Sequence, residues 1–183
     1  PGSSDYVARD VWVPAERVCG SVEHSPFAQR PIYRFPRFAL LGIPIGAICL
    51  GMARASLDEV LRVAQQKTPQ GSRRTLAMRS GLHRDLAVAE ADLGAARGYF
   101  YRVIDDAWEH AQHADETLEH RRAVRTANVH AVNASIRVID RMYTVLGGTS
   151  VFETSALLET RSSTTSIGVH SALPSVTSSS HSA

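Results

Sequence analysis

Residues 82–107, LHRDLAVAEADLGAARGYFYRVIDDA, carry apolar side chains at alternating steps of three and four. The positions that form this stripe are Leu82, Leu86, Ala89, Leu93, Ala96, Phe100, Val103 and Ala107. This spacing places the side chains on one face of an α-helix. The stretch therefore predicts a long amphipathic helix, which we expect to run from about Leu76 to about His113.

Two further long helices are predicted on either side of this one. The first covers roughly Phe38–Gln66 and stops at Thr68–Ser72, where a proline and a glycine break helical geometry. The other covers roughly Leu118–Leu146 and stops at Gly147–Gly148, and a shorter helix is expected to begin near Phe152. Long helices with short connections pack as antiparallel neighbours, so the sequence predicts an all-α, up-and-down four-helix bundle.

The amino-terminal part follows a different pattern. Residues 6–13 alternate between two faces, which predicts a β-strand, and the prolines and glycine of residues 19–36 predict a loop. A lone strand has unpaired backbone groups along both edges, so we interpret it as the remnant of a missing β-domain. We predict three parts: a β-domain remnant with a linker over 1–35, the helical bundle over 36–162, and a partly disordered Ser/Thr-rich tail over 163–183.

Composition excludes several classes of partner. The chain has 183 residues, a formal net charge of +2 and arginines interleaved with acids, which predicts no nucleic-acid partner. The uncharged run Phe38–Ala53 is shorter than the roughly 20 residues that cross a bilayer, and it contains Pro44. We expect this run to be a helix buried on nearly all sides, with no membrane contact. Cys19 and Cys49 are expected to be free thiols in a cytoplasmic protein without a signal peptide.

Candidate chemical groups are few, and each has a structural alternative. Arg73 and Arg74 lie in the turn between two long helices, where they are either solvated or in contact with a phosphate near a helix start. Gly147, Gly148 and Thr149 either cap a helix or let backbone N–H groups approach a ligand. The histidines around residues 110–120 lack the Glu-x-x-His and HExxH patterns, so we predict no metal site.

The order of these features resembles the acyl-CoA dehydrogenase superfamily. Gly2–Asp5 followed by Asp10–Pro14 is similar to a Gly-Ser-x-Asp…Asp-Val-x-Val-Pro passage at the end of the family's middle β-domain. The helical bundle follows where expected, and Leu146–Ser150 resembles the family's Gly-Gly turn, which touches flavin across a subunit boundary. The chain is identified as the C-terminal part of such a protein, closest to the flavin-dependent monooxygenase branch.

The resemblance implies further residues and partners. It implies cofactor contacts at Arg73, Arg74, Gly147, Gly148 and Thr149. His170 would be the catalytic residue that hydrogen-bonds or deprotonates a substrate hydroxyl. The cofactor would be reduced flavin, FMN or FAD, bound weakly or not at all by this chain alone. A homodimer or homotetramer and a flavin reductase would be the protein partners, and the substrate would be a small aromatic or polyketide-like molecule.

One passage departs from the family. The helix after the Gly-Gly turn has Glu159 where an arginine is usual and Ser162-Ser163 where an Arg-Asp pair is usual, and the pattern resumes at residues 167–170. This predicts a reading-frame slip or a degenerate gene. Two alternatives therefore stay open: an acyl-CoA dehydrogenase-type flavoenzyme, and an inactive helical oligomerisation module. The dehydrogenase chemistry ranks lower because no glutamate lies beyond Glu159 to act as the base.

Overall fold

The computed structural model describes residues 7–17, 30–148 and 160–165. Three long helices dominate it: α2 (Ala39–Gln66), α3 (Ser80–His113) and α4 (Leu118–Leu146). Shorter elements are the one-turn helix α1 (Pro31–Arg34) and the 3₁₀ turns η1 (Ala15–Arg17) and η3 (Leu76–Met78). Residues 160–165 are also helical.

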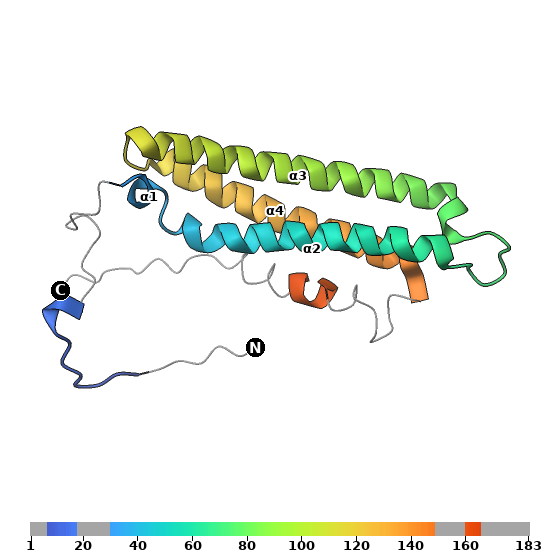
Figure 1. Ribbon diagram of the computed structural model, residues 1–183, viewed down its shortest axis with the longest axis horizontal. Coiled ribbons are helices and arrows are strands. Elements are labelled where there is room, and N and C mark those ends of the chain that lie inside the picture. The colour runs from blue at the N-terminus through green and yellow to red at the C-terminus, as the bar shows by residue number, and fades with distance from the viewer. Residues whose placement is uncertain (1–6, 18–29, 149–159, 166–183) are drawn as a thin grey trace, which may run out of the picture.

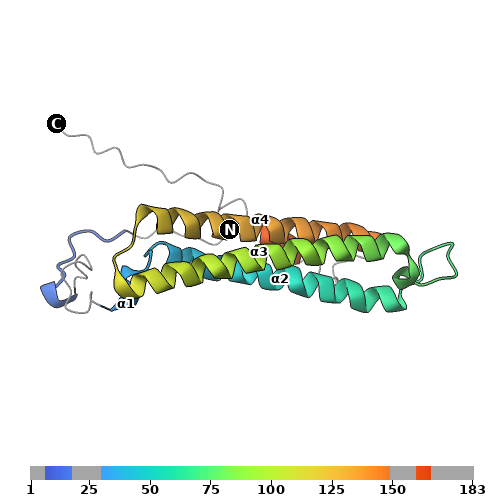
Figure 2. The same ribbon diagram turned by 90° about the horizontal axis from the view of Figure 1, so that it is seen from above.

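The three long helices form one elongated bundle (Figures 1 and 2). The chain runs along α2, returns along α3 and runs out again along α4, so α2 and α4 are parallel and α3 is antiparallel to both. α4 packs against both other helices and supplies ten of the buried side chains. The core that results is rich in alanine, with Phe100, Leu57, Ile139 and Met142 among its largest fully buried members.

The three long helices were predicted from periodicity, and the structure confirms them. α2 begins one residue after Phe38, and α4 has the predicted bounds, with the Thr117 hydroxyl accepting a hydrogen bond from the His120 N–H as its N-terminal cap. The predicted second helix is divided, because Leu76–Met78 forms the 3₁₀ turn η3 before α3 begins at Ser80. The predicted all-α class is therefore correct.

Small residues let α2 and α4 approach closely. The side chain of Asn128 on α4 lies against Gly42 and Gly46 of α2, and a Cβ built at Gly46 would lie 2.4 Å from Asn128 Oδ1 and 2.8 Å from Phe100 Cε2. Both distances are shorter than real contacts allow, so only glycine fits there. Ala53, two turns further on, is fully buried in the same core.

α2 is tied to α3 by charge. The Arg54 guanidinium donates to both Glu90 carboxylate oxygens at 2.7 and 2.8 Å and lies 3.0 Å from Asp58. The hydrogen bond that Arg54 donates to Glu90 raises the pKa of Arg54. Both Glu90 oxygens accept from the same nitrogen, Nη1, and this charge-assisted pair joins α2 to the next long helix along the chain.

The predicted strand over residues 6–13 is wrong. Residues 7–13 have no strand conformation, and Val7, Val11 and Trp12 are largely exposed. A strand exists only when its backbone groups pair with a neighbour, and the described residues provide none. The predicted loop over 19–36 also needs correction at its end, since α1 forms there and the Phe35 ring packs 6.3 Å from Trp108 of α3.

The expectation that the start of α2 is buried on nearly all sides is wrong as well. Phe38, Leu41, Ile45 and Ile48 are 85, 73, 41 and 57% exposed. By length and hydropathy α2 could cross a membrane, and 33% of its most apolar window is buried in this structure. Cys49 is buried as expected, and burial raises the pKa of its thiol. The apolar side chains of α2 are thus divided between the core and an uncovered face.

Several predictions concern residues that the structure does not describe. These are Cys19, the helix start near Phe152, Thr149, His170 and most of the tail. The boundaries of the three predicted parts stay a prediction.

We expect the substitution Gly46→Ala to lower the free energy of unfolding by about 1–3 kcal/mol, because the added methyl group must displace Asn128 or Phe100. Gly51→Ala is the matched control, since nothing lies within 4 Å of a Cβ there. That variant should be unchanged or more stable by up to about 1 kcal/mol through helix propensity. Urea unfolding followed by circular dichroism measures both. Equal behaviour of the two variants would show that the close approach is absent.

Candidate functional site

The two segments singled out as candidate cofactor contacts meet at one end of the bundle. Lys67, the residue that ends α2, donates a hydrogen bond from Nζ to the backbone oxygen of Leu146, the last residue of α4. The Lys67 backbone oxygen accepts a hydrogen bond from Leu76 N at 2.8 Å, which closes the loop between α2 and η3. The turn that carries Arg73 and Arg74 is therefore held beside the turn at Gly147.

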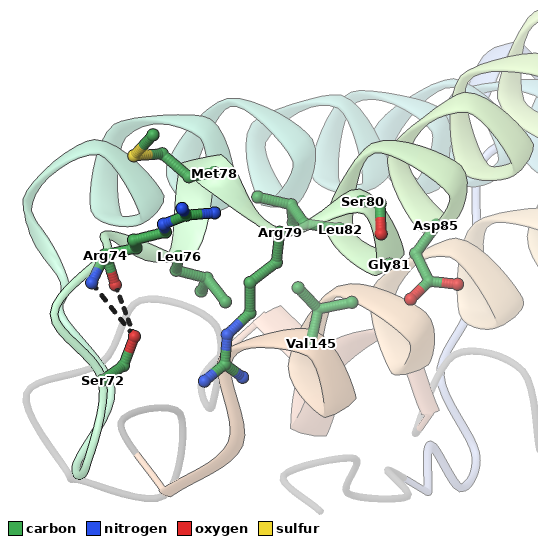
Figure 3. A pocket seen from close by; sticks show the side chains of 10 residues that line it. All are labelled: Ser72, Arg74, Leu76, Met78, Arg79, Ser80, Gly81, Leu82, Asp85 and Val145. Carbon is green, nitrogen blue, oxygen red and sulfur yellow. Dashed lines mark hydrogen bonds between the residues drawn. The ribbon is translucent and has the colours of Figure 1, made fainter.

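A hollow of about 460 Å³ opens at this end (Figure 3). Its lining residues are Ser72, Arg74, Leu76, Met78, Arg79, Ser80, Gly81, Leu82, Asp85 and Val145. They come from the α2–α3 connection, from the first turns of α3 and from the end of α4. The lining combines apolar side chains with polar and charged ones, which suits a ligand with an apolar part and a charged part.

Two of the three charged side chains in the lining are basic. The guanidinium groups of Arg74 and Arg79 form no ion pair with any described residue. Asp85 is the one carboxylate in the lining, and it lies 3.5 Å from Arg141 Nη1, so its charge is already paired. The hollow thus offers two uncompensated positive charges.

The start of α3 adds backbone donors to these charges. Arg79 is the N-terminal cap residue of α3 and makes no side-chain capping hydrogen bond. No carboxylate lies in the first turn, so nothing acidic in that turn neutralises the positive end of this long helix. A helix N-terminus flanked by arginines is a typical phosphate-binding arrangement. Ser72 stabilises the loop that carries Arg74, because its Oγ accepts a hydrogen bond from Arg74 N at 3.1 Å and donates one to Arg74 O at 3.0 Å.

The structure places the predicted site residues unequally. Arg74 lines the hollow, whereas Arg73 is exposed beside it and is not part of the lining. Gly147 caps α4 with φ 59° and ψ −137°, a conformation that favours glycine, and Gly148 is exposed. Thr149 and His170 fall outside the described residues. Arg74, Gly147 and Gly148 therefore lie at the same end of the bundle, and their contact with a cofactor stays a prediction.

Sequence reasoning missed Arg79, Ser72 and Lys67. Arg79 was missed because the helix was expected to begin at about Leu76, whereas α3 begins at Ser80 and leaves Arg79 at the positive end of the helix dipole. Lys67 carried no usable signal, since its partner is the backbone oxygen of a residue in a distant helix.

The histidines at the other end of the bundle form a separate feature. His110 and His120 stack with ring centroids 4.1 Å apart. His110 Nε2 lies 2.9 Å from the Asp115 backbone oxygen, and His120 Nδ1 lies 2.6 Å from Thr117 Oγ1. Within the described ranges no three His, Cys, Asp or Glu side chains are grouped closely enough to hold a metal ion. These contacts close the α3–α4 turn.

Comparisons with known proteins agree with the geometry. The family model for the acyl-CoA dehydrogenase C-terminal domain matches residues 43–158. Indole-3-acetate monooxygenase of Pseudomonas putida is 31% identical over 157 residues, which are 85% of this chain and 40% of that protein. The indole-3-acetate monooxygenase of Acinetobacter baumannii is 27% identical over 152 residues, 82% of this chain and 39% of that protein.

Two solved structures share the fold. XiaF from Streptomyces sp., solved in complex with FADH2 and glycerol, superposes with a TM-score of 0.75 at 19% identity over 88% of this chain and 43% of that one. Nitroalkane oxidase of Podospora anserina gives a TM-score of 0.62 at 16% identity over 73% of this chain and 30% of that one. The chain thus spans about 40% of the length of the curated relatives it matches.

Proposed function

The chain belongs to the acyl-CoA dehydrogenase C-terminal domain family, and from that premise we propose that it is the C-terminal helical part of a flavin-dependent monooxygenase. The reaction would be hydroxylation of a small aromatic or polyketide-like substrate with reduced flavin. The names of the two curated relatives support the reaction class, because both are indole-3-acetate monooxygenases. The flavin bound to XiaF supports the cofactor class.

The observation that carries the proposal is the basic hollow at the end of the bundle. Arg74 and Arg79 lie at the start of α3 without a carboxylate partner among the residues that the structure describes, and the α4 terminus with Gly147 lies beside them. These residues fit the phosphate part of a flavin nucleotide, either FMN or FAD. When bound, reduced flavin would supply the electrons that activate dioxygen. The chain's own role at this hollow is to hold the phosphate group with two guanidinium groups and the first N–H groups of α3.

Partners follow from the same family reading. A separate flavin reductase would supply reduced flavin, and the protein would act in the cytoplasm as a homodimer or homotetramer. The exposed face of α3 supports self-association, because it carries a run of small side chains over which another helix can approach closely. Its members are Ala87, Ala91, Gly94, Ala95 and Gly98.

The segment around residues 159–163, which departs from the family pattern, bears on the alternative of an inactive oligomerisation module. Within it, Arg161 Nε donates to Asp140 Oδ1 at 2.7 Å, and its guanidinium lies 4.6 Å from the Tyr143 ring centroid. Arg161 is thus engaged with α4 and does not replace the arginine for which Glu159 stands. If this loss abolishes catalysis, the intact protein should still assemble but should not turn over substrate.

We expect this chain alone to bind FMN or FAD weakly, because the hollow contacts only the phosphate end of the cofactor. Titration followed by flavin fluorescence measures the affinity. Arg74→Glu combined with Arg79→Glu should lower it by about tenfold or more. The double variant Arg122→Glu with Arg137→Glu, at a distance from the hollow and equal in charge change, is the control. Equal losses in the two double variants would assign the effect to net charge and would remove the hollow from the proposal.

Self-association through residues 76–146 should give a dimer or tetramer in light scattering at micromolar concentration. Ala91→Glu with Ala95→Glu should shift the protein toward a monomer, because two carboxylates on the small-residue face block close helix contact. A 19.9 kDa monomer for the unaltered chain would contradict the proposed assembly.

In an enzyme completed with the missing part of the protein, His170→Ala should lower hydroxylation by about 10²-fold or more, the usual scale for losing an acid–base group. Flavin affinity should change little, since the proposed role of His170 concerns the substrate. Turnover at the unaltered rate would exclude that role, and a loss of flavin binding would make His170 a cofactor contact instead.

A further inference from the structure

The side of α3 that faces away from the other two long helices is uncovered by described residues. α3 lies along one edge of the bundle, and α2 and α4 lie together on its other side (Figures 1 and 2). A Cβ built at Gly94 or Gly98 meets no atom within 4 Å, so the middle of this side is open. We call this side the outer face of α3, and its exposed members are Ser80, Arg84, Ala87, Ala91, Gly94, Ala95, Gly98, Arg102, Asp105 and Glu109.

The outer face has small residues in the middle and charges of opposite sign at its two ends. Arg84 lies in the N-terminal half, whereas Asp105 and Glu109 lie in the C-terminal half. None of these three side chains makes an ion pair with another described residue. Arg102 is the remaining charged member, and its guanidinium donates to Asp106 of the same helix at 3.2 Å. Each half of the face therefore has charge available for a partner.

Arg84 and Asp105 cannot neutralise one another within a single chain. Both lie on one continuous helix, and the helical rise places them about 32 Å apart. An ion pair requires the charged atoms to come within about 4 Å of each other. The two opposite charges of this face can therefore meet only between two copies of the chain.

A second copy of α3 laid antiparallel on the outer face matches the first one along its length. When the two helices cross between Gly94 and Ala95, Arg84 lies opposite Asp105 of the second copy. The other opposed positions are Ala91 with Gly98, Ala87 with Arg102, Val88 with Tyr101, Gly81 with Trp108 and Ser80 with Glu109. Apart from one apolar pair, each of these pairs contains glycine, alanine or serine. The face is therefore complementary to itself in size as well as in charge.

We propose that the outer face of α3 binds the same face of a second copy in antiparallel orientation, about a two-fold axis between Gly94 and Ala95. The proposal rests on the self-association included in the proposed function, and it specifies the surface, the orientation and the register. The small residues allow the two helices to approach closely. The two symmetry-related pairs of Arg84 with Asp105 select the antiparallel orientation.

Two other partners fit this face less well. A parallel second copy would place Arg84 against Arg84 and Asp105 against Asp105, and like charges repel. The exposed strip of α4 in a second copy is also a poor match, because its charged members are Arg122, Arg125 and Arg137. That strip would meet Asp105 favourably but would bring like charge to Arg84.

Charge exchange between the two positions tests the proposal on the full chain. Arg84→Glu should raise the dissociation constant for self-association by about tenfold or more, because two-fold symmetry creates two like-charge contacts. Asp105→Arg should do the same. The two substitutions combined in one chain should restore the association of the unaltered chain, since each copy then presents the exchanged pair. Sedimentation velocity over a concentration series measures all four proteins.

A mixing experiment and matched controls complete the test. The two single variants, each weakened alone, should associate when mixed in equal amounts, because every like-charge contact becomes an opposite-charge one. Arg125→Glu and Glu119→Arg make the same charge changes at exposed positions of α4 and should leave the dissociation constant unchanged. All four substituted side chains are exposed, and circular dichroism confirms that each variant keeps its helical content.

Four outcomes would overturn the proposal. Self-association that ignores both single substitutions keeps the proposed assembly but removes α3 pairing from it. Recovery in the mixture without recovery in the double variant assigns the contact to parallel helices. Association that is lost in Arg125→Glu assigns the partner surface to α4. A monomeric unaltered chain excludes the pairing and the proposed self-association together, whereas the flavin titration tests the hollow independently of either.

Discussion

The contact at Gly46 sets the geometry of the whole bundle. Because this position has no side chain, Asn128 of α4 and Phe100 of α3 both reach the backbone of α2. The three helices therefore meet around one point near the middle of the molecule. α4 lies in contact with both neighbours from there on, and the alanine-rich core follows from the short distances that result.

The location of the candidate site is a consequence of this arrangement. α2 and α4 run in the same direction, so their C-terminal ends lie together, and α3 returns with its N-terminus at that same end. Two helix ends that expose backbone oxygens thus meet one that exposes N–H groups. Lys67 satisfies the last backbone oxygen of α4, and Arg74 and Arg79 surround the start of α3. The positive charge at this end of the bundle comes from these three side chains.

The helices were predictable because their periodicity spans many turns, and chance matches to such a pattern are rare. The position of Arg74 near Gly147 was not predictable, since the residues are far apart in sequence and local patterns do not say which helix ends meet. Two errors have a common physical origin. Residues 7–13 alternate as a strand does, and residues 38–48 are apolar as a buried helix is, yet pairing and burial both require neighbours that a local pattern does not specify. Arg79 was missed because its importance comes from the dipole of the helix that follows it.

The part of α2 before Pro44 should unfold locally more easily than the part after Cys49. Pro44 has no N–H, so the Leu40 backbone oxygen lacks its partner within the helix, and most residues from Arg37 to Ile48 have little covering them. From Cys49 onward the side chains on one face of the same helix are buried in the core. Amide hydrogens before Pro44 should therefore exchange with solvent through small local openings, while those beyond Cys49 should exchange only when the bundle itself opens. A single helix thus contains two units of different cooperativity, and the weaker unit is the one with the uncovered apolar face.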